Sequence, residues 1–344
     1  MPAKPNSEPA LRHSSPLKTQ PDVAIAGAGV IGLSLALELH RRGASVRVHE
    51  SRKALQQASF AAAGMLAAED PHNPSQLLQL ARYSVELYPG FLRYIESLGG
   101  IRVAFQTEAT LQYLPSGNIL RLAERSLDPR QLAVALLAAI RNTSIELCQD
   151  STLKTHISCG QMVYATGAWT QARDLAAMQA EVTARVAIPV TPRKGQMLRV
   201  QVPQSLPLRE VHRSEHVYIV PRTLGEQAGS ALIGATVEDA GFDTAVHQRD
   251  LDHLRSLAAK LLPALASGRE APLLEAWAGL RPATPDGLPV LGRIGSSSEF
   301  VATGHFRNGI LLAPATAVLL ADLLEGRPPA VDLSAFSPGR FPAR

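Results

Sequence analysis

Three glycines and an acidic residue near the beginning of the chain have the spacing of a dinucleotide-binding turn. The glycines form a Gly-x-Gly-x-x-Gly pattern directly after the apolar run 23–26, and the acid follows the last glycine by eighteen residues. The first glycine permits a tight turn, the second lets backbone amides approach a pyrophosphate, and the third lets a helix pack closely on the preceding strand. The helix N-terminus adds partial positive charge for the phosphates, and the acid is placed to bind a ribose diol. The residues predicted to contact the dinucleotide here are Gly27, Gly29, Val30, Ile31, Gly32 and Glu50.

The elements that must position these residues follow from the hydrophobic pattern. Leucines recur through residues 33–39, and the predicted helix ends at Gly43, where a left-handed residue costs least. An alternating strand over 46–48 then leads to the acid. A glycine-rich turn without a ligand is the alternative, but the βαβ context with its terminal acid favours a dinucleotide.

Two further segments predict surfaces against which a flat ligand could lie. Residues 58–66 are a run of small side chains, which could simply be a packed helix because alanine is the best helix former. After a dinucleotide pattern, we interpret them instead as small because a flat ring lies against the backbone. Residues 161–169 predict a strand running into a glycine turn, where a bulky side chain would collide with the ligand. The contacts predicted from these two segments are Ala62, Ala63, Gly64, Met65, Thr166 and Gly167.

The rest of the chain combines predicted helices with one β-rich region. Between about 183 and 240, short apolar segments alternate with turn residues, which predicts a mostly antiparallel sheet. The pattern therefore indicates an α/β protein, with a Rossmann-like parallel sheet and a smaller domain built on the antiparallel sheet. Helices are predicted over 75–88, where Pro89-Gly90 interrupts them, from Asp128-Pro129 onward, over 250–267 and over 311–324.

The composition limits the classes of function. The 344 residues have a formal net charge of +4 and 46% hydrophobic residues, which fits a soluble enzyme and does not indicate nucleic-acid binding. Cys148 and Cys159 are too few for a disulfide framework and wrongly spaced for a metal site, which favours a reducing, cytoplasmic location. The apolar stretch 23–37 is too short for a membrane span of about 20 residues. Residues 1–20 are expected to be a flexible tail without a signal-peptide core.

Several strings taken together resemble one family. They are AGAGVIGLSLALEL, AAAGML, VYATGAW, EHVYIVPR, LIGATVEDAGFD, WAGLRPATPDGLPVLG and GHFRNGILLAPAT, which occur in this order within residues 21–325. These strings resemble the FAD-dependent D-amino-acid-oxidase-like superfamily, and most closely the glycine oxidases of thiamine biosynthesis. The resemblance implies that the dinucleotide is FAD. Segments 101–125 and 148–162 are shorter than is usual in that family, which affects the expected size of the sheet and the oligomer contacts more than the chemistry.

The resemblance also implies a discontinuous domain organisation. The FAD-binding domain is expected to comprise residues 21–90, 126–182 and 276–330, the substrate-binding domain residues 91–125 and 183–275, and a C-terminal tail residues 331–344. The FAD is expected to be non-covalent, because residues 280–310 contain no cysteine and Ala61 stands where some relatives carry a flavin-linking histidine.

The resemblance implies two residues that bind the carboxylate of an amino acid. Arg281 is the first, because a guanidinium meets a carboxylate in bidentate geometry and stays charged at any working pH. Its alternative role is an ion pair with Glu275 or Asp286. Tyr218 is the second, since its hydroxyl would donate another hydrogen bond to the carboxylate; packing on a sheet face is its alternative role.

The loop before the last helix is implied to face the flavin pyrimidine and the substrate. Its backbone amides and the helix dipole would stabilise negative charge on the reduced ring. Arg307 serves either the substrate or the flavin, and both roles stay open. We interpret His305 as structural, because direct hydride transfer from a neutral amine needs no catalytic acid or base. The cofactor contacts implied for this loop are Gly304, Phe306, Arg307, Asn308, Gly309, Ile310 and Leu311.

The implied activity is an FAD-dependent oxidase of small amino acids, with glycine as the expected substrate. The Cα hydrogen passes as hydride to flavin N5, the imine product feeds assembly of the thiamine thiazole, and O₂ is reduced to H₂O₂. An oxidase or dehydrogenase of sarcosine or a D-amino acid is the nearest alternative. An NADPH-dependent flavin hydroxylase and a non-catalytic FAD-binding subunit are more distant alternatives. No metal, nucleic acid or membrane span is expected, and a homo-oligomer is an open expectation, since related proteins are often tetramers.

Overall fold

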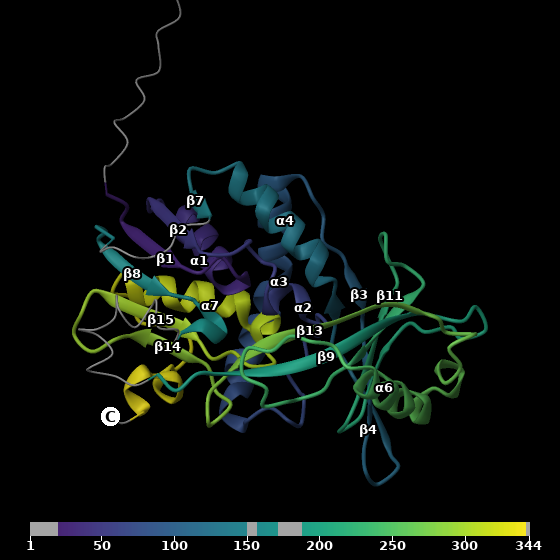
Figure 1. Ribbon diagram of the computed structural model, residues 1–344. Coiled ribbons are helices and arrows are strands. Elements are labelled where there is room, and N and C mark those ends of the chain that lie inside the picture. The colour runs from purple at the N-terminus through teal and green to yellow at the C-terminus, as the bar shows by residue number, and fades with distance from the viewer. Residues whose placement is uncertain (1–19, 150–156, 171–187, 342–344) are drawn as a thin grey trace, which may run out of the picture.

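The computed structural model describes residues 20–149, 157–170 and 188–341, and contains two large sheets (Figure 1). The first sheet has the strand order β14-β15-β8-β1-β2-β7, and all its pairs are parallel except β14 with β15. This sheet confirms the predicted Rossmann-like architecture. Its strands are β1 (Val23–Ala26), β2 (Val46–Glu50), β7 (Glu146–Gln149), β8 (Gln161–Tyr164), β14 (Val290–Arg293) and β15 (Glu299–Thr303).

Strand β1 lies at the topological switch point of this sheet. From β1 the chain continues through α1 (Val30–Arg41) to β2 on one side, whereas β8 pairs with β1 on the other side. Ligands of open α/β sheets bind outside the carboxyl ends of the strands at such a point. The sheet therefore places a crevice directly beyond Ala26 and Tyr164.

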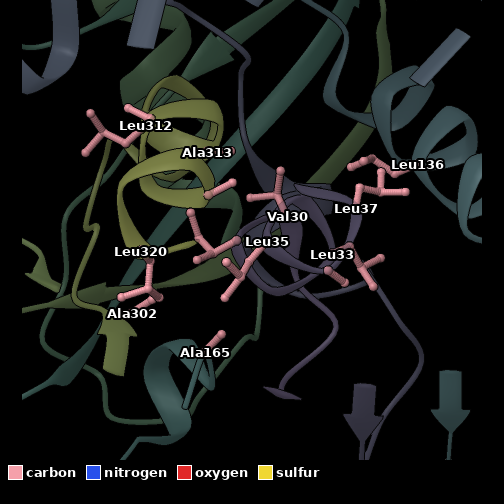
Figure 2. Close-up of a cluster of buried hydrophobic side chains, with 14 of the residues drawn as sticks. Val30, Leu33, Leu35, Leu37, Leu136, Ala165, Ala302, Leu312, Ala313 and Leu320 are labelled. Atoms are coloured by element: carbon pink, nitrogen blue, oxygen red, sulfur yellow. The ribbon is translucent and has the colours of Figure 1, made fainter. Parts of the chain in front are cut away.

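Buried apolar side chains hold the helices of this layer against the sheet. Helix α1 lies between α7 (Gly309–Leu324) and α4 (Pro129–Arg141), as Figure 2 shows, and α3 (Leu78–Gly99) packs on α7. Eight of the ten residues from Val30 to Leu39 are apolar or glycine, and all ten are buried, which explains why α1 sits inside the core rather than on its surface. Burial of such side chains contributes roughly 1.5–3 kcal/mol each.

The second sheet has the order β13-β9-β12-β11-β10-β4-β5 and is antiparallel except between β10 and β4. It confirms the predicted antiparallel sheet. Helix α6 (Gln248–Leu261) covers one of its faces, where Ile219 is buried, while Tyr218 belongs to the opposite face with Ala63 and Met65. Its strands are β4 (Thr110–Tyr113), β5 (Ile119–Leu122), β9 (Thr191–Gln201), β10 (Val211–Arg213), β11 (Tyr218–Arg222), β12 (Ser230–Gly234) and β13 (Leu273–Ala283).

Smaller elements join the two sheets. A two-stranded sheet pairs β3 with β6, and α2 precedes the segment that runs toward α3. The predicted start of α4 is confirmed, because the Asp128 side chain accepts a hydrogen bond from the Arg130 N–H at the N-cap and Pro129 begins the helix. The remaining bounds are β3 (Phe105–Thr107), β6 (Ser126–Leu127) and α2 (Ala58–Ala61). The 3₁₀ turns of the described residues are Ser75–Leu77, Gly167–Trp169, Pro263–Leu265, Ser334–Phe336 and Pro338–Arg340.

The predicted interruption of a helix at Pro89-Gly90 is wrong. Helix α3 runs unbroken from Leu78 to Gly99 with Pro89 in its interior. The buried side chains of Tyr88, Leu92 and Ile95 pack in the core, and the Tyr88 hydroxyl donates to the Ile310 carbonyl. These contacts outweigh the hydrogen bond that proline removes, a penalty of about 3 kcal/mol in an isolated helix.

Three segments lie differently from the expected division of the chain. Residues 91–99 were expected with the substrate-binding segments, but they complete α3, and Leu92 and Ile95 are buried in the core of the first layer. Residues 276–283 belong to β13 and pair with β9 in the second sheet, although they were expected with the FAD-binding segments. Residues 331–341 were expected to be a tail, yet Val331, Leu333 and Phe336 are buried in the core of the first layer. The expected N-terminal tail and the segment 171–182 lie almost wholly outside the described residues. Within the described ranges, no helix has the length and apolar character needed to cross a membrane.

Candidate active site

One elongated cavity begins beyond the carboxyl ends of β1 and β8 and reaches the second sheet. Most of the residues predicted from the sequence to form the site lie together in its wall. Those residues are Gly27, Gly29, Val30, Ile31, Glu50, Ala62, Ala63, Gly64, Met65, Thr166, Gly167, Tyr218, Arg281, Phe306, Arg307, Asn308, Gly309 and Ile310. Three predicted contacts, Gly32, Gly304 and Leu311, do not line the cavity, because they pack behind its wall.

Three glycines of the predicted motifs let backbone segments around the cavity pack more closely than any side chain would permit. A Cβ on Gly27 would lie 2.4 Å from the Ala165 carbonyl oxygen, and one on Gly32 would lie 1.9 Å from the Gly27 oxygen. A Cβ on Gly64 would lie 2.0 Å from the Leu127 carbonyl oxygen. Gly29 is the N-cap of α1 and has no side chain to cap the helix, and the first helical residues, Val30 and Ile31, line the cavity with it. This cradle fits the pyrophosphate and ring of a dinucleotide such as FAD.

Glu50 ends β2 and lines the same part of the cavity. Its Oε2 accepts a hydrogen bond from the Ala28 N–H at 2.8 Å, and its Oε1 accepts one from the Arg52 N–H at 2.9 Å. The glycine turn therefore holds the carboxylate in place. Two carboxylate oxygens accept about four hydrogen bonds, so acceptor capacity remains for a ribose diol.

The N-terminus of α7 forms the opposite end of the cavity. Asn308 is its N-cap, and the wall includes Asn308, Gly309 and Ile310. Phe306 has a φ of +44°, a left-handed conformation that is unusual for a bulky residue, and its N–H donates to the Pro282 carbonyl at 2.7 Å. The turn thus directs the positive end of the α7 dipole at the cavity.

Arg281 points into the cavity from β13 without a carboxylate partner. Its Nη1 donates to the Thr236 carbonyl at 3.0 Å, and no carboxylate of the described residues lies within ion-pair distance. The two acids proposed as its alternative partners are engaged elsewhere, Glu275 with Arg130 and Asp286 with Arg340. Burial and the neighbouring positive charge of Arg307 lower the pKa of Arg281, which Tyr218 partly opposes. A half-buried cation of this kind is prepared to receive an anion.

Tyr218 lines the cavity beside Arg281 rather than packing only on the sheet. The hydroxyl of Tyr218 lies 3.5 Å from the Met197 sulfur, and it also interacts electrostatically with Arg281. Glycines make room for both side chains, because a Cβ on Gly234 would lie 2.8 Å from the Tyr218 hydroxyl and one on Gly195 would lie 2.2 Å from Arg281 Nη1. A phenol and a guanidinium thus converge where a carboxylate could bind.

His305 belongs to the cavity wall, but its side chain is almost fully buried and neutral. Its side chain is 3% exposed, and its Nε2 lies 3.1 Å from Thr316 Oγ1. Burial lowers the pKa of His305 to about 3. A neutral imidazole buried against a hydroxyl is suited to packing rather than to taking a proton from a substrate.

The titration of His305 leads to a prediction about stability. An unfolded chain ionises histidine near its ordinary pKa of about 6.5, so the unfolded state binds an extra proton as the pH falls from about 6.5 toward about 3. We expect the free energy of unfolding, measured by urea titration, to fall over this window and to fall less in His305→Asn. The exposed His253 provides the control, since His253→Asn should keep the full pH dependence of the parent. Equal slopes for His305→Asn and the parent would refute the assignment.

Several residues in the wall were missed from the sequence. Ser59 Oγ accepts a hydrogen bond from the Val30 N–H at 3.0 Å, and Arg52 stacks on the Trp169 ring at 4.3 Å. Asp70 also lines the cavity, with Oδ2 3.8 Å from Arg307 Nη2. Trp169 ends the string VYATGAW, which supports the family resemblance, so it could have been proposed as a site residue from the sequence. Asp70 lies in no such string or motif, and the sequence around it does not indicate a site.

Comparison with known proteins identifies the family of this chain. The profile of the family described as FAD dependent oxidoreductase (DAO) matches residues 22–132 and 106–323. The bifunctional protein ThiO/ThiG of Trichormus variabilis is 35% identical over 93% of this chain and 55% of its own length. The chain therefore spans about half the length of such relatives. The glycine oxidase of Geobacillus kaustophilus is 32% identical, over 92% of this chain and 96% of its own length.

Solved structures give the same result for the fold. The crystal structure of glycine oxidase from Geobacillus kaustophilus matches with a TM-score of 0.83 at 28% identity, covering 92% of this chain and 98% of that one. The crystal structure of iminodiacetate oxidase from Chelativorans sp. matches with a TM-score of 0.78 at 22% identity, and the match covers 92% of this chain and 98% of that one. At this identity the match supports the fold alone. The chain belongs to the FAD-dependent oxidoreductase family.

Proposed function

We propose that this chain is a glycine oxidase, which converts glycine to its imine and passes the electrons to O₂. The observation that supports this most is the Arg281 guanidinium in the cavity, which has a backbone carbonyl and Tyr218 beside it but no carboxylate of the described residues. The names of the relatives support the choice of glycine among small amino acids.

Arg281 and Tyr218 bind the substrate carboxylate in this proposal. The guanidinium donates to it in bidentate geometry, the phenol donates another hydrogen bond, and Arg307 adds positive charge from the α7 side. These contacts orient the Cα–H bond toward the cofactor end of the cavity. Bound FAD supplies the acceptor for the two electrons removed with the Cα hydrogen. The substrate also loses one proton to leave the imine, and O₂ gains two electrons and two protons to give H₂O₂.

No protein acid or base is needed in this mechanism if the substrate amine is neutral. Burial lowers the pKa of His305 to about 3, and its Nε2 lies 3.1 Å from Thr316 Oγ1, so we assign it no role as a base. The rate should therefore follow ionisation of the substrate amine, and no catalytic residue is assigned to proton transfer.

We propose that the FAD is bound without a covalent bond. Ala61 lies in the cavity wall and has no nucleophilic atom, and residues 280–310 contain no cysteine. Acid precipitation of the purified protein should release all of its yellow colour into the supernatant. A coloured pellet would show a covalent flavin.

We also propose how the imine product is used. Relatives named ThiO/ThiG support a role in which the imine supplies the thiazole of thiamine, and this would require release close to a cytoplasmic thiazole synthase. A thiamine-requiring strain that lacks its own glycine oxidase should grow without thiazole when it carries this chain. Failure to grow, with glycine oxidation intact, would remove the thiamine role and keep the oxidase.

Gly195→Ala is expected to disable the carboxylate site while leaving the cofactor bound. The new Cβ would overlap the Arg281 guanidinium, with Nη1 at 2.2 Å, and the side chain would have to leave its place. We expect kcat/KM for glycine to fall by about 10- to 100-fold, with unchanged FAD content. Gly268→Ala is the control, because its Cβ would meet no heavy atom within 4 Å. Unchanged kinetics in Gly195→Ala would mean that Arg281 is not held where substrate binds.

Anaerobic titration of the purified protein with glycine, sarcosine and D-alanine tests the proposed function. Glycine should bleach the flavin absorbance and, in air, yield one H₂O₂ for each imine. A rate with D-alanine or sarcosine far above that with glycine would change the substrate within the same chemistry. Reduction by NADPH without an amine would indicate a hydroxylase, and no reduction by any amine would indicate a non-catalytic FAD-binding subunit.

A further inference from the structure

The segment between α2 and α3 carries a buried carboxylate to the cavity wall, which the mechanism above does not use. The Asp70 side chain is 7% exposed and lines the cavity. Its Oδ1 accepts a hydrogen bond from the His72 N–H at 2.9 Å and lies 3.0 Å from His72 Nδ1. These contacts hold one carboxylate oxygen and direct the other away from His72.

That second oxygen lies between two guanidinium groups from distant parts of the chain. Asp70 Oδ2 is 3.7 Å from Nη1 of Arg213 on β10 and 3.8 Å from Nη2 of Arg307 before α7. These distances are too long for hydrogen bonds, so both attractions are electrostatic. Burial raises the pKa of the Asp70 carboxyl, but Arg213 and Arg307 more than offset this, and its pKa lies below the ordinary value. An ionised Asp70 therefore separates two cations that would otherwise repel each other.

Arg213 is a fixed charge on the second sheet. Its side chain is 1% exposed, its Nε donates to Gln112 Oε1 at 2.5 Å, and its Nη1 lies 3.0 Å from Glu124 Oε2. Neither Nη atom makes a hydrogen bond within the described part of the chain. Glu124 compensates part of this charge, and the unused donors of the guanidinium still attract the Asp70 carboxylate, because a buried cation with unsatisfied donors is costly. Arg213 thus fixes the position of Asp70 from the sheet side.

A second contact joins the same segment to the residue after Arg307. Asn73 Oδ1 accepts a hydrogen bond from Asn308 Nδ2 at 2.8 Å, and Asn73 Nδ2 donates to the Ala67 carbonyl at 3.1 Å. Asn308 is the N-cap of α7 and follows the left-handed Phe306 by two residues. The segment therefore supports this turn at two adjacent residues, one through charge and one through a hydrogen bond.

We propose that Asp70 is a positioning residue that holds the Arg307 guanidinium at the substrate end of the cavity, against the fixed charge of Arg213. This inference rests on the proposed function, because it gives the position of Arg307 a role in binding a carboxylate. The Arg307 side chain is 29% exposed, so without Asp70 it can turn toward solvent, away from Arg281 and Arg213. The substrate carboxylate would then still bind to Arg281 and Tyr218, but it would lose its attraction to the Arg307 guanidinium.

A double-mutant cycle on the FAD-loaded protein tests this inference. The probe is acetate, a carboxylate that cannot be oxidised here, and the readout is its Kd from the change in flavin absorbance. We expect Asp70→Asn to weaken acetate binding by about tenfold in the parent and by less than about twofold in an Arg307→Ala background. The amide oxygen of the introduced asparagine can still accept the His72 N–H, so the segment should keep its fold, and cofactor-free unfolding curves check this.

Two further variants complete the test. Asp70→Glu keeps the charge, so its Kd for acetate should lie closer to the parent value than that of Asp70→Asn, and it carries the test if Asp70→Asn does not fold. Glu69→Gln is the matched control: it removes the neighbouring carboxylate, which is 41% exposed and bonded to Arg82 at 2.7 Å, and should leave the Kd unchanged.

The outcomes separate the inference from the proposed function. An unchanged Kd in Asp70→Asn, or the same loss with and without Arg307, overturns the positioning role while the parent still binds acetate and is reduced by glycine. A parent protein that carries FAD but responds to neither acetate nor glycine overturns the proposed function and the inference with it.

Discussion

Arg281→Ala is expected to lower kcat/KM for glycine by about 100-fold or more while the protein keeps its FAD. The arginine is a half-buried cation that faces the cavity without a carboxylate partner among the described residues, so alanine removes the main attraction for the substrate carboxylate. A charge-assisted bidentate contact of this kind contributes about 2–3 kcal/mol. The effect should appear in steady-state kinetics and as a loss of acetate binding followed by flavin absorbance.

Arg193→Ala is the matched control for this variant. Arg193 lies opposite Arg281 in the β9–β13 register, but its side chain is 38% exposed and pairs with Asp239 at 3.0 Å. The Arg193→Ala substitution removes one positive charge from the neighbouring strand, outside the cavity wall, and should change kcat/KM for glycine by less than about threefold. If both variants were equally impaired, the general positive charge of these strands would matter rather than the Arg281 contact.

Gly32→Ala is expected to abolish FAD binding, and to destabilise the fold by about 3 kcal/mol or more. The added Cβ would lie 1.9 Å from the carbonyl oxygen of Gly27 and 3.1 Å from its carbonyl carbon. Because the obstructing atoms are backbone, no rotamer change can relieve the overlap, so the turn that carries the cradle must move. The FAD retained per chain after gel filtration and the Tm of the cofactor-free protein measure the two effects.

Gly90→Ala is the control that shows whether replacing any helical glycine with alanine lowers FAD binding or stability. Gly90 lies within α3, and a Cβ there would meet no heavy atom within 4 Å. Alanine should therefore keep full FAD content and raise the Tm slightly, because it reduces the freedom of the unfolded chain. If Gly32→Ala kept stoichiometric FAD and the Tm of the parent, the turn would accommodate a Cβ that this structure has no space for.

The first sheet and its cradle could be predicted because their signals are local. The glycine spacing, the alternating strand before Glu50 and the Asp128-Pro129 helix start each depend on residues within one βαβ unit or one turn. The contacts Gly32, Gly304 and Leu311 were expected in the wall but lie behind it. Residue spacing shows that a motif is present, but not which of its members turn toward the ligand.

Features that depend on tertiary contacts were missed. The continuity of α3 through Pro89 follows from Tyr88, whose hydroxyl reaches the Ile310 carbonyl more than two hundred residues away. The two arginines near Asp70 come from β10 and from the loop before α7, and the sequence around Asp70 predicts neither contact. Gly195 matters only because the β9–β13 register brings it against Arg281. Each of these pairings is a property of the folded chain rather than of a sequence window.

A crystal structure of the protein with FAD and acetate tests the central claim most directly, namely that a flavin occupies this cavity and a cationic side chain binds a carboxylate beside it. We predict the isoalloxazine between the Ala62–Met65 segment and the N-terminus of α7, with the acetate oxygens within hydrogen-bond distance of the Arg281 guanidinium and the Tyr218 hydroxyl. Acetate bound elsewhere, with Arg281 turned from the flavin or paired with a protein carboxylate, would contradict this account.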